Sequence, residues 1–363
     1  MLQSPRIRKE PTLKRIPTTR WKALIGATAL LAAAASSAPA VSGAAVEKSH
    51  GTVALRLGYL PNLTHAADLI GISGGYFAND LGSGVSLQTT AFNAGPDVVT
   101  ALFGGQLDAA YLGPGPAITA FQNSHGAYQI VAGAASGGAA LVVQPTITSV
   151  AQLKRTTLST PQMGNTQDVS LRVWLKSKGL KTTVVGTGDV TILPQTNSNI
   201  VTAFQAKAIA GAWVPEPYVA TLVANGGHVL VNEASLWPKG KFATTVLLVN
   251  KAYLKAHPTV ISGLIHGELD AINHLNSNLP SAETEINNAI KAVTGKRLSP
   301  AIMHAALSDV TLTYDPIATS IDKDATNAYK LNFLTSGSIK GIYNVTLLNA
   351  LLKKAKLPAV VAS

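Results

Sequence analysis

Residues 99–118 read VTALFGGQLDAAYLGPGPAI, and this run contains one complete change from helix to strand and back to helix. A helical apolar pattern ends at Phe103, and a short apolar run that follows two glycines ends at Leu112. Residues 113–116, Gly-Pro-Gly-Pro, then interrupt the chain before a second helical pattern. Because proline in the first turn of a helix sacrifices no useful backbone donor, it is a natural helix start. The run therefore predicts a helix, a strand and a second helix, the pattern of a parallel α/β sheet.

A second run, residues 201–216, aligns with residues 99–114 without a gap and reads VTAFQAKAIAGAWVPE. Val-Thr-Ala opens both runs, and an aromatic residue stands near the end of both, Tyr111 in the first and Trp213 in the second. Each apolar run stops at a loop that contains proline. The sequence therefore predicts two α/β lobes with the same local plan.

Strand and helix patterns alternate through the rest of the first two thirds of the chain. We expect strands at residues 53–60, 85–92, 107–112, 156–159, 190–193 and 208–214. The prediction is an α/β fold in which each lobe is a mostly parallel sheet flanked by helices, with a hinge between the lobes. Lobe I is expected to comprise residues 51–140 plus 245–363, and lobe II residues 141–244. The apolar segments 139–144 and 244–250 are expected to connect the lobes, and the tail from Lys251 is expected to be mainly helical.

The first 40 residues have the layout of a secretory signal peptide. Seven Lys and Arg residues and one acid lie in residues 1–22, an apolar run covers residues 23–35, and Ala38-Pro39-Ala40 follows. The apolar run is shorter than the roughly 20 residues that a transmembrane helix needs, and an uncleaved membrane anchor is the alternative. We expect a signal peptide over residues 1–40, cleavage after Ala40 with Ala44 as the second position, and export to the periplasm.

The basic character of the chain comes largely from this leader. The formal net charge of +11 falls to about +5 after residue 40, where 22 basic and 17 acidic residues remain. No dense run of Lys and Arg interleaved with aromatics follows, so no nucleic-acid partner is expected. The absence of cysteine excludes disulfides, thiolate zinc sites, a cysteine nucleophile and a lipid-modified cysteine at the cleavage position.

Small, uncharged, polar residues dominate the loops that follow the predicted strands. Parallel sheets bind ligands beyond the carboxyl ends of their strands. Several of these loops open helices, whose unpaired N–H groups form a ready anion site, and glycine allows close approach to the backbone. The candidate ligand-binding residues are Asn62, Thr64, His65, Gly95, Gly113, Gly115, Ser136, Gly137, Gly164, Asn165, Thr166, Trp213 and Glu216.

Enzyme and metal interpretations find less support in the sequence. Residues 71–75, GISGG, match the G-x-S-x-G motif of serine hydrolases, but a helical pattern precedes Ser73 where that motif needs a strand. The eight histidines form no H-x-x-x-H pair and have no cysteine partner, so no metal site is expected. Phosphate-loop and dinucleotide fingerprints are absent, and we expect neither a cofactor nor catalysis.

Four segments resemble, in order and spacing, the aliphatic-sulfonate, nitrate and taurine-binding proteins of ABC importers. The segments are GYLPNLTHAADLIGISGGYF (58–77), FNAGPDVVTALFGGQLDAAYLGPGPAI (92–118), LSTPQMGNTQDVSLRVWLKSKGL (158–180) and GAWVPEPYVATLV (211–223). The resemblance covers roughly residues 53–250 and implies an exported, two-lobed periplasmic-binding-protein type II fold. Such a protein closes on a small solute and presents it to a membrane permease. The resemblance also implies ligand contacts at Asn62 and Thr64, at Gly113 and Gly115, and at residues 164–166.

Two residues of the second lobe, Trp213 and Glu216, each allow two interpretations of their role. Trp213 could pack against an alkyl or aromatic tail of the ligand, or it could belong to the core. Glu216 could pair with an amine on the ligand, or it could anchor a neighbouring donor. The family commonly has G-x-I-D-A-W at this place, whereas residues 207–213 read KAIAGAW. The glycine turn and the acid are therefore missing, although Asp108 remains in the first-lobe run.

The sequence thus predicts a monomeric binding protein that delivers an aliphatic sulfonate or another small oxyanion to an importer. Nitrate, taurine and a thiamine precursor are the alternative ligands. An enzyme on the same fold is the other alternative. Hydroxymethylpyrimidine-phosphate synthases resemble this lobe pattern, but they carry a cysteine-rich motif that this chain lacks.

Overall fold

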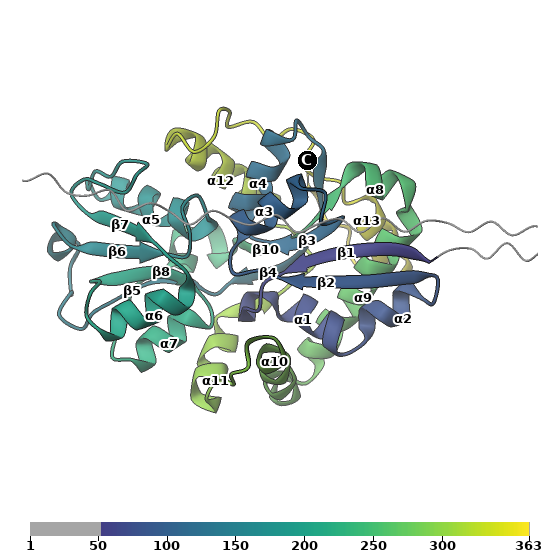
Figure 1. Ribbon diagram of the computed structural model, residues 1–363, viewed down its shortest axis with the longest axis horizontal. Helices are drawn as coiled ribbons and strands as arrows, with labels where there is room; N and C mark the ends of the chain where they lie inside the picture. Colours follow the sequence, from purple (N-terminus) through teal and green to yellow (C-terminus); the bar gives the residue numbers. More distant parts are fainter. Residues whose placement is uncertain (1–51, 363) are drawn as a thin grey trace, which may run out of the picture. The chain divides into compact units, whose positions relative to one another are not determined.

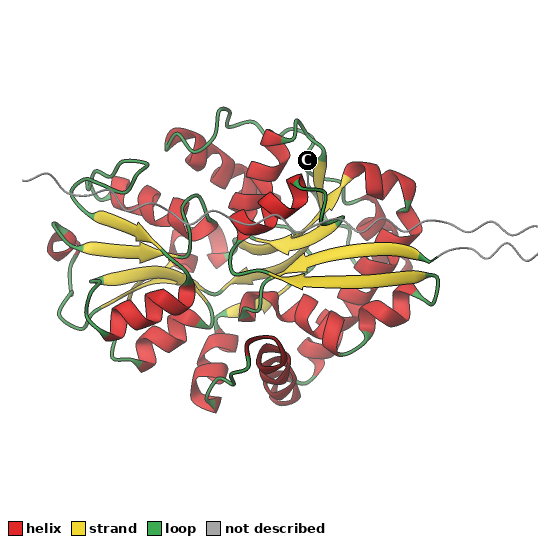
Figure 2. Cartoon of the chain, viewed as in Figure 1, coloured by secondary structure: helices red, strands yellow, loops and turns green. Residues whose placement is uncertain are grey.

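The computed structural model describes residues 52–362. The expected signal peptide, residues 1–40, lies outside the described residues. In the described part, strands and helices alternate as far as β10, and helices dominate the rest (Figure 2). The strands are β1 (Val53–Tyr59), β2 (Val85–Ala91), β3 (Ala109–Leu112), β4 (Tyr128–Gly137), β5 (Ala139–Val143), β6 (Thr157–Thr160), β7 (Thr191–Pro194), β8 (Gly211–Pro215), β9 (His228–Asn232), β10 (Ala243–Asn250) and β11 (Val310–Leu312).

Helices cover both faces of the sheets. The α-helices are α1 (Ala66–Ser73), α2 (Tyr76–Leu81), α3 (Gly95–Phe103), α4 (Pro114–Asn123), α5 (Thr166–Ser177), α6 (Asn197–Gln205), α7 (Tyr218–Ala224), α8 (Lys251–Ala256), α9 (Pro258–Ser277), α10 (Leu279–Thr294), α11 (Pro300–Ser308), α12 (Ala318–Lys330) and α13 (Thr346–Lys354). The short 3-10 turns are η1 (Leu63–His65), η2 (Val150–Leu153), η3 (Glu233–Leu236) and η4 (Pro238–Gly240). None of the described helices is long and apolar enough to cross a membrane.

The strands form two sheets, one in each lobe (Figure 1). The lobe I sheet has the order β11-β4-β10-β3-β1-β2, and the lobe II sheet has the order β7-β6-β8-β5-β9. β1 pairs in parallel with both β2 and β3, and β6 pairs in parallel with both β7 and β8. The predicted α/β fold of two sheets flanked by helices is confirmed. The expectation that each sheet is mostly parallel is wrong, because β4, β5, β9, β10 and β11 pair with their neighbouring strands only antiparallel.

The chain passes between the sheets at two places. β4 ends at Gly137 and β5 begins at Ala139, so the first crossing is a turn at two glycines. Gly137 and Gly138 have φ angles of 82° and 68°, a left-handed conformation that glycine adopts without steric cost. The second crossing runs from β9 to β10 through η3 and η4. The expected segments 139–144 and 244–250 are therefore strands that follow the crossings, β5 and most of β10.

Each lobe has its own apolar core. In lobe I, α1, α2 and α9 pack against one another, and the fully buried Leu55, Phe77 and Ile265 belong to one hydrophobic cluster there. In lobe II, Trp174 and Trp213 pack with their ring centroids 6.1 Å apart in the cluster between β8 and α5. Burial of such side chains contributes about 1.5–3 kcal/mol each. These cores hold the strand ends, and the loops that follow them, in fixed positions.

Candidate functional site

A small, enclosed cavity lies where the carboxyl ends of strands from both sheets face one another. Loops after β1, β2 and β3 of lobe I and after β6 and β7 of lobe II contribute to it, together with the last residue of β8 and the start of β10. Its lining residues are Leu60, Asn62, Thr64, His65, Asn93, Gly95, Gly113, Asn165, Thr166, Gln167, Asn197, Pro215 and Thr244. This interlobe cavity has a volume of about 20 Å³, which is room for about one water molecule.

Seven of the predicted site residues line this cavity: Asn62, Thr64, His65, Gly95, Gly113, Asn165 and Thr166. They come from segments far apart in the sequence, which meet because parallel strands end at the same edge of a sheet. None of the lining residues is acidic, and His65 is the one titratable side chain among them. The cavity is therefore lined by backbone amides, side-chain amides, hydroxyl groups and one imidazole.

Helix starts surround the cavity. Gly95 is the first residue of α3, Gly113 precedes α4, Asn165 precedes α5, and Asn197 is the first residue of α6. The N–H group of Gly95 makes no hydrogen bond within residues 52–362. In α4, Pro114 and Pro116 carry no N–H group, so Gly115 supplies the one donor of the first three helical positions. The partial positive charge at these helix ends favours an anion.

The Gly115 donor is occupied by a side chain from the opposite lobe. The N–H group of Gly115 donates to Thr166 Oγ1, at 3.2 Å. A methyl group added at Gly113 would lie 2.5 Å from the same oxygen, and one at Gly115 would lie 3.2 Å from Thr166 N. The two glycines therefore allow α5 of lobe II to approach the start of α4 closely.

His65 is held by a buried carboxyl. Its Nδ1 lies 3.2 Å from Asp68 Oδ2, and both side chains are almost completely buried. Burial raises the pKa of Asp68, and the neighbouring imidazole partly offsets this rise. When a proton lies between Nδ1 and Oδ2, Nε2 is left as the ring nitrogen that is free for other partners.

The lobe II half of the cavity is positioned by a buried ion pair. Asp168 accepts hydrogen bonds from Thr160 Oγ1, from the N–H of Gly164 and from Arg172 Nε, each at 3.0 Å. Asp168 and Arg172 are almost completely buried. The pair ties the end of β6, the loop and α5 together, and Asn165 then caps α5 by accepting from the N–H of Thr166 at 2.7 Å.

Two buried oxygens at the cavity have no partner among the described residues: Asn197 Oδ1 and Thr244 Oγ1. Buried polar atoms are normally hydrogen-bonded, so unpaired ones facing a cavity indicate where a ligand's polar groups would bind. Sequence reasoning missed both residues, and also Leu60, Asn93, Gln167 and Pro215. Asn93 follows β2, Gln167 lies in the first turn of α5, and Pro215 ends β8, whereas Thr244 is the second residue of β10, an antiparallel strand that the rule for parallel sheets does not cover.

The other predicted site residues lie outside this cavity. Gly115 and Gly164 border a neighbouring surface pocket, and Gly115 reaches the interlobe cavity only through Thr166. Ser136 and Gly137 end β4 and pair with β10 and β11. Gly137 serves the crossing between the sheets.

Trp213 belongs to the core of lobe II. Its side chain is fully buried, and Nε1 donates to Glu233 Oε2 at 2.6 Å. Trp213 packs in the core against Trp174 of α5, whereas Pro215, the last residue of β8, lines the cavity. We therefore leave Trp213 out of the ligand site.

Glu216 is buried beside the start of α7. Its Oε2 accepts from the N–H of Ala220 at 3.1 Å, so the carboxyl itself fills the anion position at this helix start. Burial, reinforced by Asp309, raises the pKa of Glu216 to about 8. The geometry matches the anchoring role considered from the sequence, and we leave Glu216 out of the ligand site.

The G-x-S-x-G segment ends a helix. Ser73 is the last residue of α1, and that serine follows a helix where a hydrolase motif needs a strand.

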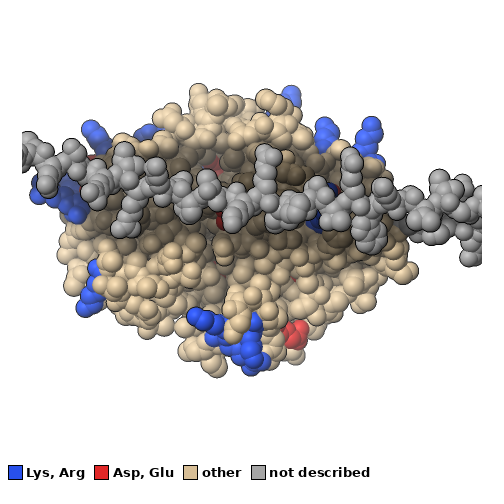
Figure 3. Space-filling model, viewed as in Figure 1, with Lys and Arg blue, Asp and Glu red and all other residues tan. Residues whose placement is uncertain are grey.

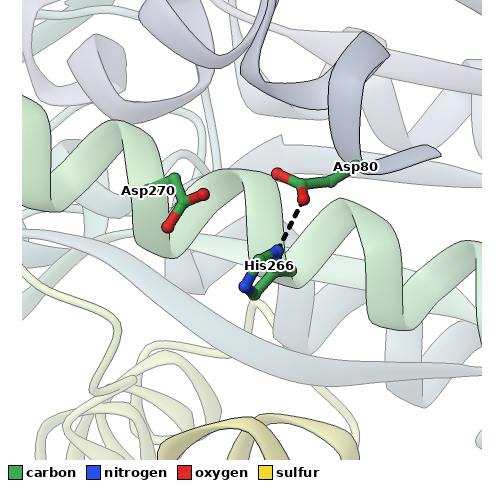
Figure 4. Close-up of side chains that lie close together, drawn as sticks. All are labelled: Asp80, His266 and Asp270. Carbon is green, nitrogen blue, oxygen red and sulfur yellow. Dashed lines mark hydrogen bonds and ion pairs between the residues drawn. The ribbon is translucent and has the colours of Figure 1, made fainter. Parts of the chain in front are cut away.

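Within residues 52–362, one group of side chains has a spacing that could hold a metal ion: Asp80, His266 and Asp270 (Figure 4). His266 Nδ1 and Asp80 Oδ1 are 2.6 Å apart, and the imidazole is half exposed. An ordinary surface ion pair accounts for this contact.

Charged side chains do not form a continuous patch on the face seen in Figure 3. Where grey atoms do not cover that face, Lys and Arg lie in separate groups near its edge, and most of the surface is uncharged.

Comparison with known proteins finds sequence similarity to binding proteins. The taurine-binding periplasmic protein of Escherichia coli K12 is 29% identical over 190 residues, which are 52% of this chain and 57% of that protein. The chain thus spans about half the length of the curated relatives it matches.

Solved structures share the fold. The nitrate-binding protein NrtA from Synechocystis PCC 6803 matches with a TM-score of 0.71 at 12% identity, over 86% of this chain and 92% of that one. The alkanesulfonate-binding protein SsuA from Xanthomonas axonopodis pv. citri, bound to MOPS, matches with a TM-score of 0.64 at 19% identity, over 80% of this chain and 96% of that one. These relatives confirm the resemblance seen in the sequence. The model of the NMT1-like family matches residues 48–291, and the chain belongs to that family.

Proposed function

We propose that the protein is the solute-binding component of an ABC importer and that it captures a small oxyanion, such as an aliphatic sulfonate, in the interlobe cavity. The observation that carries the proposal is the lining of that cavity. Helix starts from both lobes converge on it, and no acidic side chain is among its lining residues. This arrangement favours a negatively charged headgroup over a cation.

The hydrogen-bond donors at the interlobe cavity are sufficient for micromolar affinity. Hydrogen bonds to a charged group contribute about 1.5–3 kcal/mol each, and micromolar binding needs about 8 kcal/mol. The N–H groups of Gly95 and Gly115, His65 Nε2 and the amide of Asn62 are four candidate donors. His65 Nε2 is a donor in the form of the imidazole that carries a proton on Nε2, with Nδ1 at the Asp68 carboxyl.

Binding requires the lobes to move apart. A cavity of about 20 Å³ is too small for a sulfonate group, which carries three oxygens on one sulfur. We propose that the ligand enters when α5 moves away from α4, and that a ligand oxygen then takes the place of Thr166 Oγ1 at the N–H of Gly115. The crossings at Gly137-Gly138 and at residues 233–242 would act as the hinge.

In this proposal the mature protein acts in the periplasm as a monomer, with a membrane permease as its partner. The signal-peptide layout of residues 1–40 and the periplasmic relatives support that location. Neither catalysis nor a nucleic-acid partner is part of the proposal.

A thermal-shift panel tests the proposal. Ethanesulfonate, butanesulfonate, nitrate, sulfate and a thiamine precursor would be added to the purified mature protein, with ethanol and ethylammonium as uncharged and cationic controls. A ligand at 100 times its dissociation constant stabilises the folded state by about 2.7 kcal/mol. We expect a clear rise in Tm with at least one oxyanion and none with the controls. No shift with any anion would contradict the oxyanion proposal.

One observation favours taurine as a second candidate ligand. Asn197 Oδ1 is a buried acceptor without a partner at the cavity, and it would suit the ammonium group of an aminosulfonate. Taurine and ethanesulfonate differ only by that ammonium group. A larger Tm shift with taurine that disappears in Asn197→Leu would identify the aminosulfonate, and equal shifts would favour a simple sulfonate.

A further inference from the structure

A second, larger cavity lies beside the hinge. Its volume is about 550 Å³, within the range of about 300–1,000 Å³ that is usual for small-molecule sites. Three segments form its walls: the carboxyl-terminal half of α5 in lobe II, the crossing segment with η3 and η4, and α12 in lobe I. α5 and α12 are in contact, and Figure 1 shows both along the upper side of the view. We call it the hinge cavity.

Asp324 of α12 gives this cavity a free acceptor. Its side chain lines the cavity although the residue is only 7% exposed, and its carboxyl makes no hydrogen bond or ion pair with any residue in the part described. The other buried acid, Glu233, is already occupied, because it accepts from Ser170 Oγ at 2.8 Å and from Trp213 Nε1 at 2.6 Å. Of the two buried acids that line the hinge cavity, Asp324 is therefore the one without a hydrogen-bond partner.

The walls near this carboxyl are aromatic and apolar. Trp174 and Trp237 line the hinge cavity together with Val173, Leu236 and Ile317. Trp237 stacks on Phe242 with a centroid separation of 5.9 Å, which fixes its ring. Tryptophan is the side chain that best attracts an organic cation over its ring face, and a carboxylate supplies the opposite charge.

We propose that the hinge cavity is a second binding site and that it takes a small organic ammonium ion, with the ammonium group at Asp324 and the apolar body against Trp174 and Trp237. Burial and the charge of Glu233 raise the pKa of Asp324, and an ammonium ion beside the carboxyl opposes this rise because it favours the ionised form. Any proton that the carboxyl carries passes to solvent when the ammonium ion binds, and the ion pair that forms is neutral overall. Lys241 and Lys323 also line the cavity with exposed side chains, and neither forms an ion pair with Asp324.

Cyclohexylammonium is a suitable probe, because cyclohexanol and cyclohexanecarboxylate share its apolar body without its positive charge. Binding to the mature protein would be followed by tryptophan fluorescence and by calorimetry in two buffers of different ionisation enthalpy. We expect the ammonium ion to bind at least tenfold more tightly than the alcohol or the carboxylate, with proton release. Asp324→Asn should reduce its affinity at least tenfold, whereas Asp270→Asn on α9, outside the cavity, should leave the affinity unchanged.

Two further variants keep the result interpretable. Trp237→Leu should weaken binding of the ammonium ion, and melting curves would verify that each variant is folded. Asn197→Ala alters the interlobe cavity, so a loss of ammonium binding in Asn197→Ala but not in Asp324→Asn would overturn the proposal. No ammonium binding at millimolar concentration, or preference for the carboxylate, would overturn it as well.

Discussion

The two lobes build their halves of the interlobe cavity from matching runs of sequence, yet they leave these halves with different chemistry. α3 and α6 have the same length, with Gly95 aligned to Asn197 at the start and Phe103 aligned to Gln205 at the end. In lobe I, the starts of α3 and α4 have no cap from a lobe I side chain, and the N–H of Gly115 is paired only with Thr166 of lobe II. In lobe II, each helix start has its own acceptor: Asn165 for α5, Thr196 for α6 and Glu216 for α7.

Because of this difference, we expect the two lobes to contact the ligand in different ways. Uncapped helix starts and His65 make lobe I the half that would bind the negative charge. Lobe II would close over the ligand and contribute neutral side chains such as Asn165, Thr166 and Asn197. The following predictions test that division of roles.

The largest effect is expected at the ion pair that holds the lobe II loop. Asp168→Asn leaves Arg172 buried without its partner, which should cost about 3–5 kcal/mol of unfolding free energy. Lobe I has a more exposed Asp–Arg pair, in which Asp108 accepts from Arg56 Nη2 at 2.6 Å and the arginine side chain is 40% exposed. Asp108→Asn should therefore cost only about 1 kcal/mol. Denaturant unfolding of both variants would measure the contrast, and equal losses would contradict it.

Substitution of His65 tests the binding role of lobe I. His65→Asn keeps a donor near the Nδ1 position for Asp68 but removes Nε2, and it should weaken sulfonate binding about 10- to 100-fold, the loss of one hydrogen bond to a charged group. His65→Gln keeps a donor near the Nε2 position and should bind more tightly than His65→Asn. In lobe II, Asn197→Ala should weaken binding of a simple sulfonate by less than about tenfold. Calorimetric titration would rank the variants, and a larger loss in Asn197→Ala than in His65→Asn would reverse the assignment of roles.

The pKa of Glu216 predicts a dependence of stability on pH. Burial raises this pKa from its usual 4.5 to about 8, so the folded state binds a proton that the unfolded state has lost between these values. The stability that the group contributes is complete below pH 4.5 and is lost as the pH rises through 8. Glu216→Gln keeps an acceptor for the N–H of Ala220 but cannot ionise. The variant should gain about 1.4 kcal/mol over the wild type for each pH unit between 5 and 8, and the two should converge near pH 5.

The smallest effect is expected at the turn before β8. Lys207 has a φ of 56°, and Gly105, at the matching place in lobe I, has a φ of 65°. The missing glycine noted in the sequence has therefore not removed the turn, and lysine adopts the left-handed conformation in its place. Lys207→Gly should stabilise the protein by about 1 kcal/mol, and Gly105→Ala should destabilise it by a similar amount. Thermal melting would detect both changes in stability. A destabilised Lys207→Gly variant would show that contacts of the lysine side chain contribute more to stability than relief of the left-handed backbone conformation.

Much of the fold could be predicted from the sequence, because apolar periodicity and turn residues act locally. The two lobes were predicted from the helix–strand runs that contain Tyr111 and Trp213. The two places where the chain passes between the sheets were predicted from the apolar segments 139–144 and 244–250. The antiparallel strands β5 and β10 were not predicted as such. Strand direction depends on how distant segments pair, and periodicity does not record it.

The residues of the ligand site were predicted less completely, because whether a residue lines the cavity depends on the direction of its side chain. A loop can be located from its glycines and prolines, but these residues do not tell which neighbouring side chains line the cavity. Trp213 and Pro215 are two residues apart on β8, and only Pro215 lines the cavity. Thr244 was missed because β10 enters the site by its first residues and runs against the neighbouring strand β3.

A crystal structure with ethanesulfonate bound tests the central claim most directly. The account predicts a single sulfonate in an enlarged interlobe cavity, with its oxygens within hydrogen-bond distance of Gly95 N, His65 Nε2 and Gly115 N, and with Thr166 Oγ1 displaced from Gly115. A sulfonate held by the starts of α5 and α6, with no contact to α3, α4 or His65, would contradict it.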